Sequence, residues 1–277
     1  MTNHSMQPKM RSLNAQNNTL TIAKSSAIDE VVSKNVCAST SCETCSLKGI
    51  CLPSGLCDED KSRIATFIKK PQVYRKNQHI YHQSHSFEAF YAVRSGAVKT
   101  YALTEEGEEL ITGFYLPGEV IGLDGLWADE YQNSAVALNS SSVCMVDFKQ
   151  LMQMNQQIPE LQHKILRLMS REINSDQQML HVLSRKSAES RLAIFLLNYS
   201  ERLKPLKLSA NSFQLPMSRG DISSLLGMAI ETVCREFTHL QKQGILEVSR
   251  KDIRIVNIDQ LRKIAGQKNQ ANQAMVA

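Results

Sequence analysis

Three cysteines near the start of the chain carry the most distinctive chemistry in the sequence. Two residues separate Cys42 from Cys45, and five separate Cys45 from Cys51. Thiolates are soft ligands that suit zinc, copper and iron–sulfur clusters. No apolar run near the start is long enough for a secretory signal or a membrane span, so we expect a cytoplasmic protein with no membrane partner. Because structural disulfides are rare in the cytoplasm, the seven cysteines are expected to be metal ligands, redox sensors or buried residues.

The cysteine spacing leaves the type of site open. Structural zinc sites usually pair two Cys-x-x-Cys knuckles, and the sequence contains one. A disulfide switch between neighbouring thiols is a second option. The spacing of Cys37, Cys42 and Cys45 is that of plant-type ferredoxins, so Cys37 competes with Cys51 for a place in the ligand set of an iron–sulfur cluster.

The composition is that of a globular protein. With 42% hydrophobic and 21% charged residues, the 277-residue chain is long enough for two domains. Its net charge of +5 permits a nucleic-acid partner without requiring one. Residues 1–36 are rich in Asn, Gln, Ser and Thr and predict a disordered tail, and residues 37–57 predict a cysteine-bearing loop.

The next segment has the pattern of short strands. Between about Ile64 and Phe148 apolar residues alternate with a period near two, and glycines interrupt the pattern at regular intervals. Many short strands with regular turns predict a small antiparallel β-roll or jelly roll. His79, His82 and His85 fall in this segment, where strand and turn geometry is expected not to bring them together on a metal ion.

From Pro159 to about residue 184 the hydrophobic period changes to that of a long helix, roughly 39 Å at 1.5 Å per residue. A heptad seam runs along it, consisting of Leu166, Met169, Ile173, Asp176, Leu180 and Leu183. A helix lying only on its own roll would explain neither this spacing nor the length, so we predict a dimerisation helix. Two-fold symmetry would place Asp176 beside its copy, and repulsion between the two carboxylates would make the dimer marginal.

Two further helices are predicted near the end of the chain. Ser218 is the expected N-cap of a helix from Arg219 to Leu226, with Asp221 three residues after the cap. Gly227 supplies a turn, and a second helix follows from about Ile230 to Gln243. Two helices joined by a glycine-containing turn predict a helix-turn-helix.

The second of these helices carries residues suited to reading DNA. Glu231, Cys234 and Arg235 share one face, and the start of this helix meets base edges in a helix-turn-helix complex. Arginine can bind guanine O6 and N7, and glutamate can accept from cytosine N4, which suits a G·C pair. The alternative is a surface ion pair between Glu231 and Arg235. The predicted phosphate contacts, two of them in a wing-like basic turn, are Arg219, Thr232, Arg250 and Lys251.

Together these parts resemble the CRP/FNR superfamily of bacterial transcription regulators. The stretches AVRSGAVKTY, EEGEELITGFYLPGEV and SRGDISSLLGMAIETVCRE, with the cysteine cluster, are similar to FNR-type oxygen-responsive regulators in particular. The resemblance runs from about Cys37 to Ala265. It implies an α+β fold: an N-terminal antiparallel β-roll (jelly-roll) sensor domain, a long dimerisation helix and a C-terminal winged helix-turn-helix domain. It also implies a homodimer that is not an enzyme.

On this basis the expected boundaries are a disordered tail (1–36), a cluster-binding loop (37–57), the β-roll sensor (58–158), the dimerisation helix (159–184), the DNA-binding domain (185–265) and a second tail (266–277).

The resemblance also implies a ligand for the thiols. FNR-type regulators hold an oxygen-labile 4Fe-4S cluster with four thiolates, and the matching residues here are Cys42, Cys45, Cys51 and Cys144. Cys37 and Cys57 are then surplus. The implied function is an oxygen-sensing global regulator that dimerises while its cluster is intact and activates or represses genes of anaerobic metabolism.

Further expectations concern the partners. The resemblance implies a palindromic promoter site similar to TTGAT, four base pairs and ATCAA. It also implies contact with RNA polymerase through Ser95, Gly107 and Glu109. FNR has serine where this chain has Cys234, so base preference at an outer position of the half-site is open.

Other members of the superfamily bind cyclic nucleotides. Their phosphate-binding segment has a Gly-Glu pair followed about fourteen residues later by Arg-Ser, whose guanidinium pairs with the phosphate. Here Gly118 and Glu119 are present, but the later pair reads Asn133 and Ser134, so we predict no cyclic nucleotide. Two alternatives to the oxygen-sensing regulator are an iron–sulfur electron carrier and a cyclic-nucleotide-gated regulator without a cluster.

Overall fold

The computed structural model describes residues 42, 45–47, 49–52, 54–66, 68–155 and 158–267. The tail predicted over residues 1–36 and the thiol of Cys37 lie outside the described residues, as do residues 268–277 of the second predicted tail. No helix in these ranges is long and apolar enough to cross a membrane.

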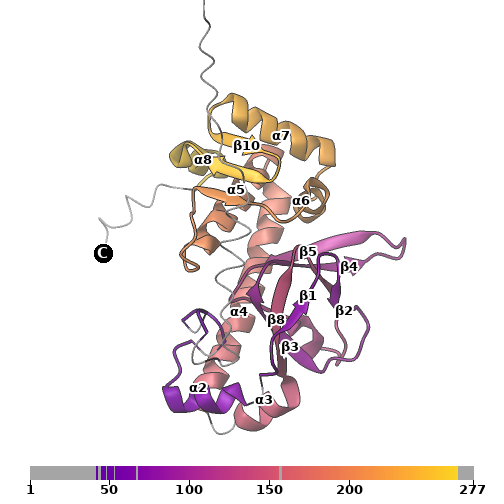
Figure 1. The fold of residues 1–277 in the computed structure, drawn as a ribbon. Helices are drawn as coiled ribbons and strands as arrows, with labels where there is room; N and C mark the ends of the chain where they lie inside the picture. Colours follow the sequence, from indigo (N-terminus) through magenta and orange to yellow (C-terminus); the bar gives the residue numbers. More distant parts are fainter. Residues whose placement is uncertain are drawn as a thin grey trace, which may run out of the picture. The chain divides into compact units, whose positions relative to one another are not determined.

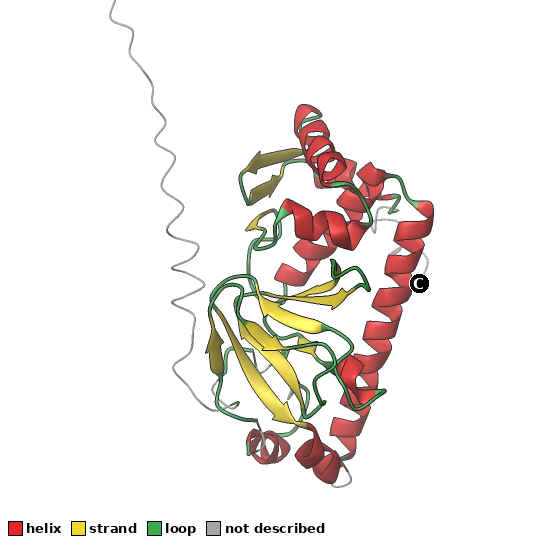
Figure 2. Cartoon of the chain, turned by 90° about the vertical axis from the view of Figure 1, so that its right-hand side faces the viewer, coloured by secondary structure: helices red, strands yellow, loops and turns green. Residues whose placement is uncertain are grey.

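The first half of the described chain is an antiparallel β-roll of two four-stranded sheets (Figures 1 and 2). One sheet has the order β1-β8-β3-β6, formed by Gln72–Tyr74, Ser141–Asp147, Ala89–Ser95 and Val120–Ile121. The other has the order β2-β7-β4-β5, formed by His79–Tyr81, Ser134–Ala137, Val98–Leu103 and Glu109–Tyr115. The roll predicted from the alternating pattern is confirmed. Two stacked tyrosines, Tyr81 and Tyr131, lie at its centre with ring centroids 4.0 Å apart.

The turn between β3 and β4 depends on Gly96. This glycine has φ +79°, and a Cβ atom there would lie 2.3 Å from Ser141 Oγ and 2.6 Å from the Ser140 carbonyl oxygen. Replacing Gly96 with alanine is therefore expected to lower the free energy of unfolding by about 3 kcal/mol, since strained φ and steric overlap add. Gly107 has φ +81° and open space around it, so Gly107→Ala should cost only about 1 kcal/mol. Urea titrations of the two variants check this difference, and equal losses would contradict it.

Two short helices flank the roll. α2 spans Asp58–Ala65 and α3 spans Phe148–Asn155. The strand pattern predicted from about Ile64 is wrong at its start, because Ile64 is the fully buried residue of α2. Three acidic residues occupy the first turn of this helix, where they interact favourably with the helix dipole.

The long helix α4 spans Pro159–Arg185 and lies along the roll (Figure 1). Its inner face packs on the roll through Leu161, Ile165 and Leu168. Further along, Tyr115 Oη donates a hydrogen bond to Glu172 Oε1 at 2.7 Å. The helix therefore does lie on its own roll, but only one of its faces is used for that contact.

The C-terminal part contains α5 (Ala188–Leu203), β9 (Ser212–Gln214), α6 (Arg219–Leu226), α7 (Ile230–Lys242), β10 (Leu246–Ser249), β11 (Asp252–Ile255) and α8 (Ile258–Ala265). The helix-turn-helix of α6 and α7 is confirmed within one residue of its predicted bounds. Ser218 and Asp221 form a reciprocal capping box at the start of α6, and Gly227 ends this helix with φ +58°. β10 and β11 form the predicted wing, which β9 extends to three strands.

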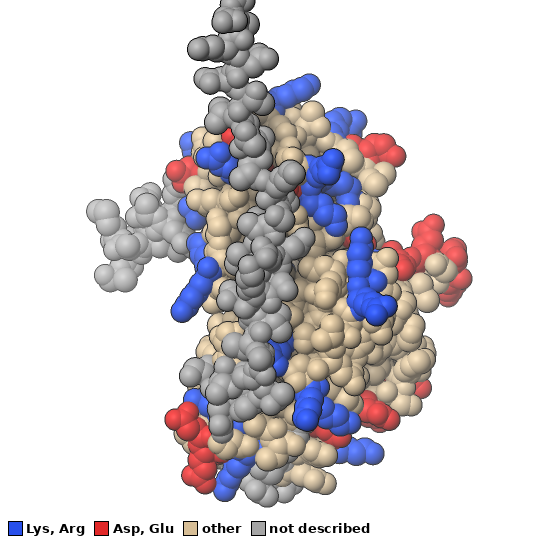
Figure 3. Space-filling model, viewed as in Figure 1, with Lys and Arg blue, Asp and Glu red and all other residues tan. Residues whose placement is uncertain are grey.

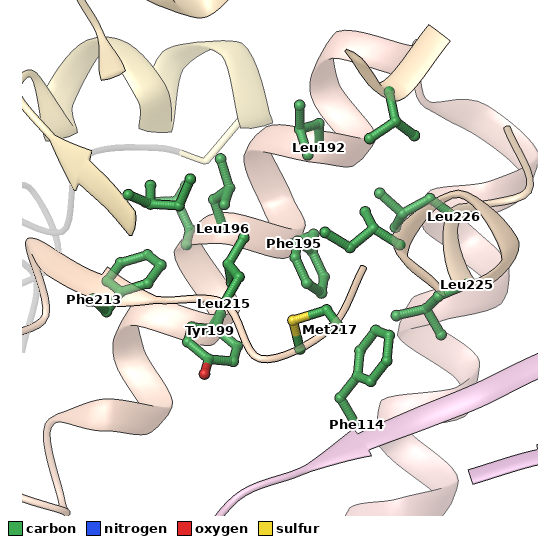
Figure 4. Close-up of a cluster of buried hydrophobic side chains, with 14 of the residues drawn as sticks. Phe114, Leu192, Phe195, Leu196, Tyr199, Phe213, Leu215, Met217, Leu225 and Leu226 are labelled. Atoms are coloured by element: carbon green, nitrogen blue, oxygen red, sulfur yellow. The ribbon is translucent and has the colours of Figure 1, made fainter. Parts of the chain in front are cut away.

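The roll and the C-terminal part share one hydrophobic cluster. Phe114 of β5 packs with Met217, Leu225 and Phe195 (Figure 4). Beside this cluster, Arg202 of α5 donates from Nε to Glu119 Oε1 at 2.9 Å and from Nη2 to the Phe114 carbonyl oxygen. The position of the helix-turn-helix against the roll is thus set by buried contacts.

Candidate metal centre and nucleic-acid interface

Four thiols line a single pocket, which we call the cysteine pocket: Cys42, Cys45, Cys51 and Cys144. The loop that holds the first three is closed by local hydrogen bonds, from Cys45 N to the Cys42 carbonyl at 3.4 Å and from Cys51 N to the Leu47 carbonyl at 2.9 Å. Cys144 comes from β8, where it is paired with Ala92 of β3. The structure therefore brings together the four cysteines matched by resemblance.

The walls of the cysteine pocket are almost entirely apolar. Leu52, Ile68 and Val146 line it, and Arg94 is its charged neighbour. Burial, with smaller contributions from the neighbouring thiols, raises the pKa of Cys51 to about 12. Burial likewise raises the pKa of Cys144 to about 11, against the opposing effect of Arg94. Without added positive charge these two thiols stay protonated at neutral pH.

The other described cysteines lie elsewhere. Cys57 is exposed and its Sγ donates to Asp60 Oδ2 at 3.1 Å, and Cys234 is exposed on α7. In the described ranges, no three His, Cys, Asp or Glu side chains are placed to hold a single metal ion. The four pocket thiols share one lining, which neither of these two cysteines joins.

The cysteine loop is attached directly to α4. Lys164 Nζ donates to Ser54 Oγ at 2.5 Å, and the Ser54 amide donates to the Cys51 carbonyl at 2.8 Å. Leu52 and Leu56 of the same loop pack with Leu161 of the helix. The cysteine loop is therefore in direct contact with α4, through a hydrogen bond and through apolar packing.

The heptad seam lies on a different face of α4. Leu166, Ile173 and Leu180 have 58%, 57% and 67% of their surface exposed, which is unusual for large apolar side chains in a row. Met169 is half-buried. Leu183 is also half-buried, because its side chain lies against Gly227 in the helix-turn-helix turn. Leu166, Ile173 and Leu180 thus form an exposed apolar stripe on α4.

Asp176 lies between the two faces of α4. Partial burial raises the pKa of its carboxyl. The neighbouring Glu172 is more buried, and burial raises its pKa too, with Tyr115 acting against the shift and Asp176 adding to it. Two carboxyl groups that are costly to ionise therefore border the exposed stripe.

The predicted base-reading residues project from α7 into solvent. Val233, Phe237 and Leu240 form the buried face of this helix, whereas Glu231 and Arg235 are exposed. Arg235 Nη2 lies 3.3 Å from Thr232 Oγ1. Glu231 and Arg235 both belong to the described part of the chain, and no ion pair joins them there. Further along, Arg235 and Lys242 line a shallow hollow that is open to solvent.

The predicted phosphate-binding residues lie around this helix. Arg219 stacks on Phe237 with its guanidinium carbon 3.5 Å from the ring centroid, and its Nη2 approaches the Arg250 carbonyl at 3.4 Å. Lys251 Nζ donates to the Pro216 carbonyl at 2.5 Å. Lys and Arg side chains gather over the α7 end of the face drawn in Figure 3. A basic surface of this kind is suited to binding phosphate groups.

The residues expected to contact polymerase occupy two places. Gly107 and Glu109 belong to the β4–β5 hairpin, whose tip carries the acidic run Glu105, Glu106 and Glu108 (Figure 3). Ser95 is half-buried at the end of β3. Glu109 also forms an ion pair within the chain, in which Lys99 Nζ lies 2.7 Å from Glu109 Oε2.

The segment that would bind a cyclic phosphate holds a carboxylate of its own. Asp124 Oδ2 accepts hydrogen bonds from the Gln132 amide, the Asn133 amide and Asn133 Nδ2 at 2.8–3.1 Å. Glu119 is engaged with Arg202. An anion there would meet a negative group in place of an arginine.

The three histidines lie near one another at the turn after β2. The rings of His79 and His82 stack with centroids 4.0 Å apart, and His85 lies 5.2 Å from His82. The turn after β2 folds back and brings the rings together. Their arrangement is a stack rather than a set of ligands for one ion.

The fold and these sites define a transcription regulator that binds DNA through a helix-turn-helix. Residues 190–264 match the Crp-like helix-turn-helix domain, and residues 71–157 match the cyclic nucleotide-binding domain. The chain is 43% identical to the transcriptional activator protein FnrA of Stutzerimonas stutzeri, over 81% of this chain and 92% of that one. It therefore belongs to the FNR group of the CRP/FNR family of transcription regulators.

Two further comparisons agree with this assignment. The fumarate and nitrate reduction regulatory protein of Escherichia coli is 38% identical over 81% of this chain and 90% of its own length. Among solved structures, FixK2 from Bradyrhizobium japonicum superposes with a TM-score of 0.67 at 31% identity, covering 73% of this chain and 99% of that chain.

Proposed function

We propose that the chain is an oxygen-responsive, homodimeric regulator of anaerobic genes that holds a 4Fe-4S cluster with Cys42, Cys45, Cys51 and Cys144. The observation that carries this proposal is the cysteine pocket, in which a loop and a strand far apart in sequence present four thiols to one apolar space. The names of the relatives, which include a fumarate and nitrate reduction regulator, support an anaerobic role.

The chemistry of the donor set fits such a cluster. Four soft sulfur ligands suit iron–sulfur chemistry, and an apolar wall limits access of water. A cluster bound there would supply an iron centre that dioxygen oxidises, and its positive charge would offset the cost of ionising the buried thiols.

The chain's own contacts provide a route from the pocket to the DNA. The cysteine loop contacts α4 through Ser54 and Lys164, and the opposite side of the helix carries the exposed heptad stripe. While the cysteine loop stays bound to α4, it favours one packing of that helix. Pairing of α4 with its copy in a second chain would then place the two α7 helices about one DNA turn apart. A loop released from the helix removes that preference, so repulsion between the Asp176 carboxylates then favours monomers.

We also propose that Glu231, Cys234 and Arg235 read bases in a palindrome similar to TTGAT, four base pairs and ATCAA, while Arg219, Thr232, Arg250 and Lys251 contact phosphate. RNA polymerase would be contacted through Ser95, Gly107 and Glu109. No cyclic nucleotide is required, because the Asp124 carboxylate occupies the segment where a phosphate would bind.

Arg235 provides a test of base reading. Arg235→Ala should weaken binding to the palindrome by roughly 10- to 100-fold and relax the preference at one base pair of each half-site. Lys251→Ala is the matched control, because loss of a phosphate contact should weaken binding to all sequences equally and reduce the salt slope by about one. Fluorescence anisotropy with substituted duplexes distinguishes the two. An Arg235→Ala protein with unchanged base preference would contradict the assignment.

The proposal as a whole is tested by iron and acid-labile sulfide analysis of protein purified without oxygen, with a gel shift on the palindrome before and after exposure to air. Stoichiometric iron and sulfide with air-sensitive DNA binding is expected. A colourless zinc protein, or DNA binding that air does not change, would reject oxygen sensing. An electron carrier would hold the cluster but ignore the duplex, and a nucleotide-gated regulator would need cyclic nucleotide and no iron.

A further inference from the structure

A partly buried cation joins the roll to the first helix of the helix-turn-helix. Lys99 Nζ lies 2.7 Å from Glu109 Oε2 on the neighbouring strand β5 and 2.9 Å from Asp221 Oδ1 on α6. The Lys99 and Asp221 side chains are 14% and 15% exposed, so water screens their interaction only weakly.

The shifted pKa values of Lys99 and Asp221 both favour the charged forms of these side chains. Burial alone would lower the pKa of Lys99, but the two carboxylates outweigh it and the pKa is raised. Burial alone would raise the pKa of Asp221, but hydrogen bonds from Ser218 and Lys99 hold it below its usual range. Asp221 is also the third residue of α6 and the partner of Ser218 in its capping box, so the cation binds the start of that helix.

Other contacts follow the same line between the two elements. The Ile111 amide of β5 donates to Ser224 Oγ at 2.9 Å, and Ser224 Oγ donates to the Glu109 carbonyl at 3.2 Å. Ile111 and Leu225 add apolar contact within the shared cluster. α6 therefore covers the outer edge of β5, the last strand of its sheet.

On its other side the helix-turn-helix is held by Arg191. The guanidinium of this residue donates from Nη1 to the Leu226 carbonyl at 3.0 Å and from Nη2 to the Leu183 carbonyl at 2.6 Å. Arg191 thus attaches the end of α6 to α4, and Lys99 attaches the start of α6 to the roll.

We propose that Lys99 is a positioning residue for DNA binding, which holds α6, and through it α7, at the orientation needed to meet both half-sites of a palindrome. This rests on the dimeric DNA-binding function proposed above. Both carboxylates lie within 3 Å of Lys99 Nζ. Removing the cation would leave Glu109 and Asp221 without their shared partner, and repulsion between the two like charges would push the β4–β5 hairpin away from α6. The recognition helix would remain folded but would lose its set angle.

The experiment compares Lys99→Met with wild type on two duplexes, a palindrome and a single half-site, under the anaerobic conditions in which wild type binds. Lys99→Met should weaken binding to the palindrome about tenfold and binding to the half-site less than twofold, because only the palindrome requires a set angle between two helices. Adding Glu109→Gln to Lys99→Met should recover about half of the loss on a logarithmic scale, since it removes the repulsion. A purely structural loss would reduce both duplexes alike, and that result, or unchanged binding to both, overturns the proposal.

A second measurement does not depend on DNA or on the cysteine pocket. Hydrogen exchange at the Ile111 amide should be faster in Lys99→Met, by about tenfold, because its acceptor Ser224 moves with α6. Ser224→Ala removes the hydrogen-bond acceptor without changing any charge, and it replaces Lys99→Met in this test if that variant does not fold. It should speed the same exchange and weaken palindrome binding two- to fivefold. Unchanged exchange in both variants rejects the positioning role, whereas iron-free wild-type protein rejects only the proposed oxygen sensing.

Discussion

Replacing Cys144 with serine is expected to remove most of the iron from anaerobically purified protein and to weaken operator binding by about 100-fold or more. Cys144 is the one pocket thiol that comes from a strand, and its pairing with Ala92 fixes its place opposite the loop. Serine has nearly the same volume, so the roll should stay intact. Its hydroxyl is a hard ligand that does not ionise at neutral pH, so it cannot replace a thiolate.

The control for this variant is Cys57→Ser. Cys57 is exposed and outside the cysteine pocket, so its loss should leave iron content and DNA binding unchanged. Iron and sulfide analysis, visible absorbance and anisotropy on the palindrome measure both variants, and thermal unfolding checks that each is folded. Full iron content in Cys144→Ser, or iron loss in Cys57→Ser, would show that the ligand set is not the one proposed.

Replacing Asp176 with alanine should convert the aerobic protein from monomer to dimer. In the symmetric pairing expected for the heptad seam, two Asp176 carboxylates oppose each other in a partly dry interface, at a cost of a few kcal/mol. Alanine removes this repulsion while Ile173 and Leu180 keep their apolar contact, so the dimer constant in air should rise by roughly 100-fold. Sedimentation velocity in air measures the change.

Two further variants separate the seam from the rest of α4. Ile173→Glu should prevent dimerisation even without oxygen, because it adds charge to the middle of the exposed apolar stripe. Gln178→Ala is the control, since at about 100° per residue Gln178 lies on the opposite side of the helix from Asp176. A monomeric Asp176→Ala protein in air, or a strong effect of Gln178→Ala, would reject this account of the seam.

Dimerisation should also depend on pH through the Asp176 carboxyl. Burial raises the pKa of Asp176, so as the pH falls toward that pKa the carboxyl becomes neutral and the repulsion disappears. Aerobic wild-type protein should therefore associate more strongly at acidic than at neutral pH. Asp176→Ala should show a weaker dependence, due mainly to Glu172, whose pKa is also raised by burial.

Local patterns in the sequence predicted the helix-turn-helix well. The capping box needs only Ser218 and Asp221, three residues apart, and Gly227 ends α6 through its own backbone freedom. The heptad stripe and the alternating strands were readable for the same reason, because their periods follow from helix and strand geometry. The grouping of the four cysteines came from resemblance, since spacing alone left Cys37 as an alternative to Cys51.

Other features left no local signal. Ile64 has the apolar character of a strand residue but lies in α2, and His79 stacks on His82 because a turn reverses the chain. Asp124 accepts hydrogen bonds from the Asn133 amide and from Asn133 Nδ2, which composition does not indicate. The heptad pattern likewise did not predict that Leu183 is half-buried against Gly227.

By itself the sequence determined which segments become strands and helices, and which faces of those helices are apolar, because neighbouring residues set backbone conformation and periodicity. Only the tertiary structure decided that Cys144 faces the cysteine loop, and that Lys99 meets Asp221 from 122 residues away. Such contacts depend on how whole elements pack, and a residue's partner across that distance is chosen by the fold and not by its neighbours in the chain.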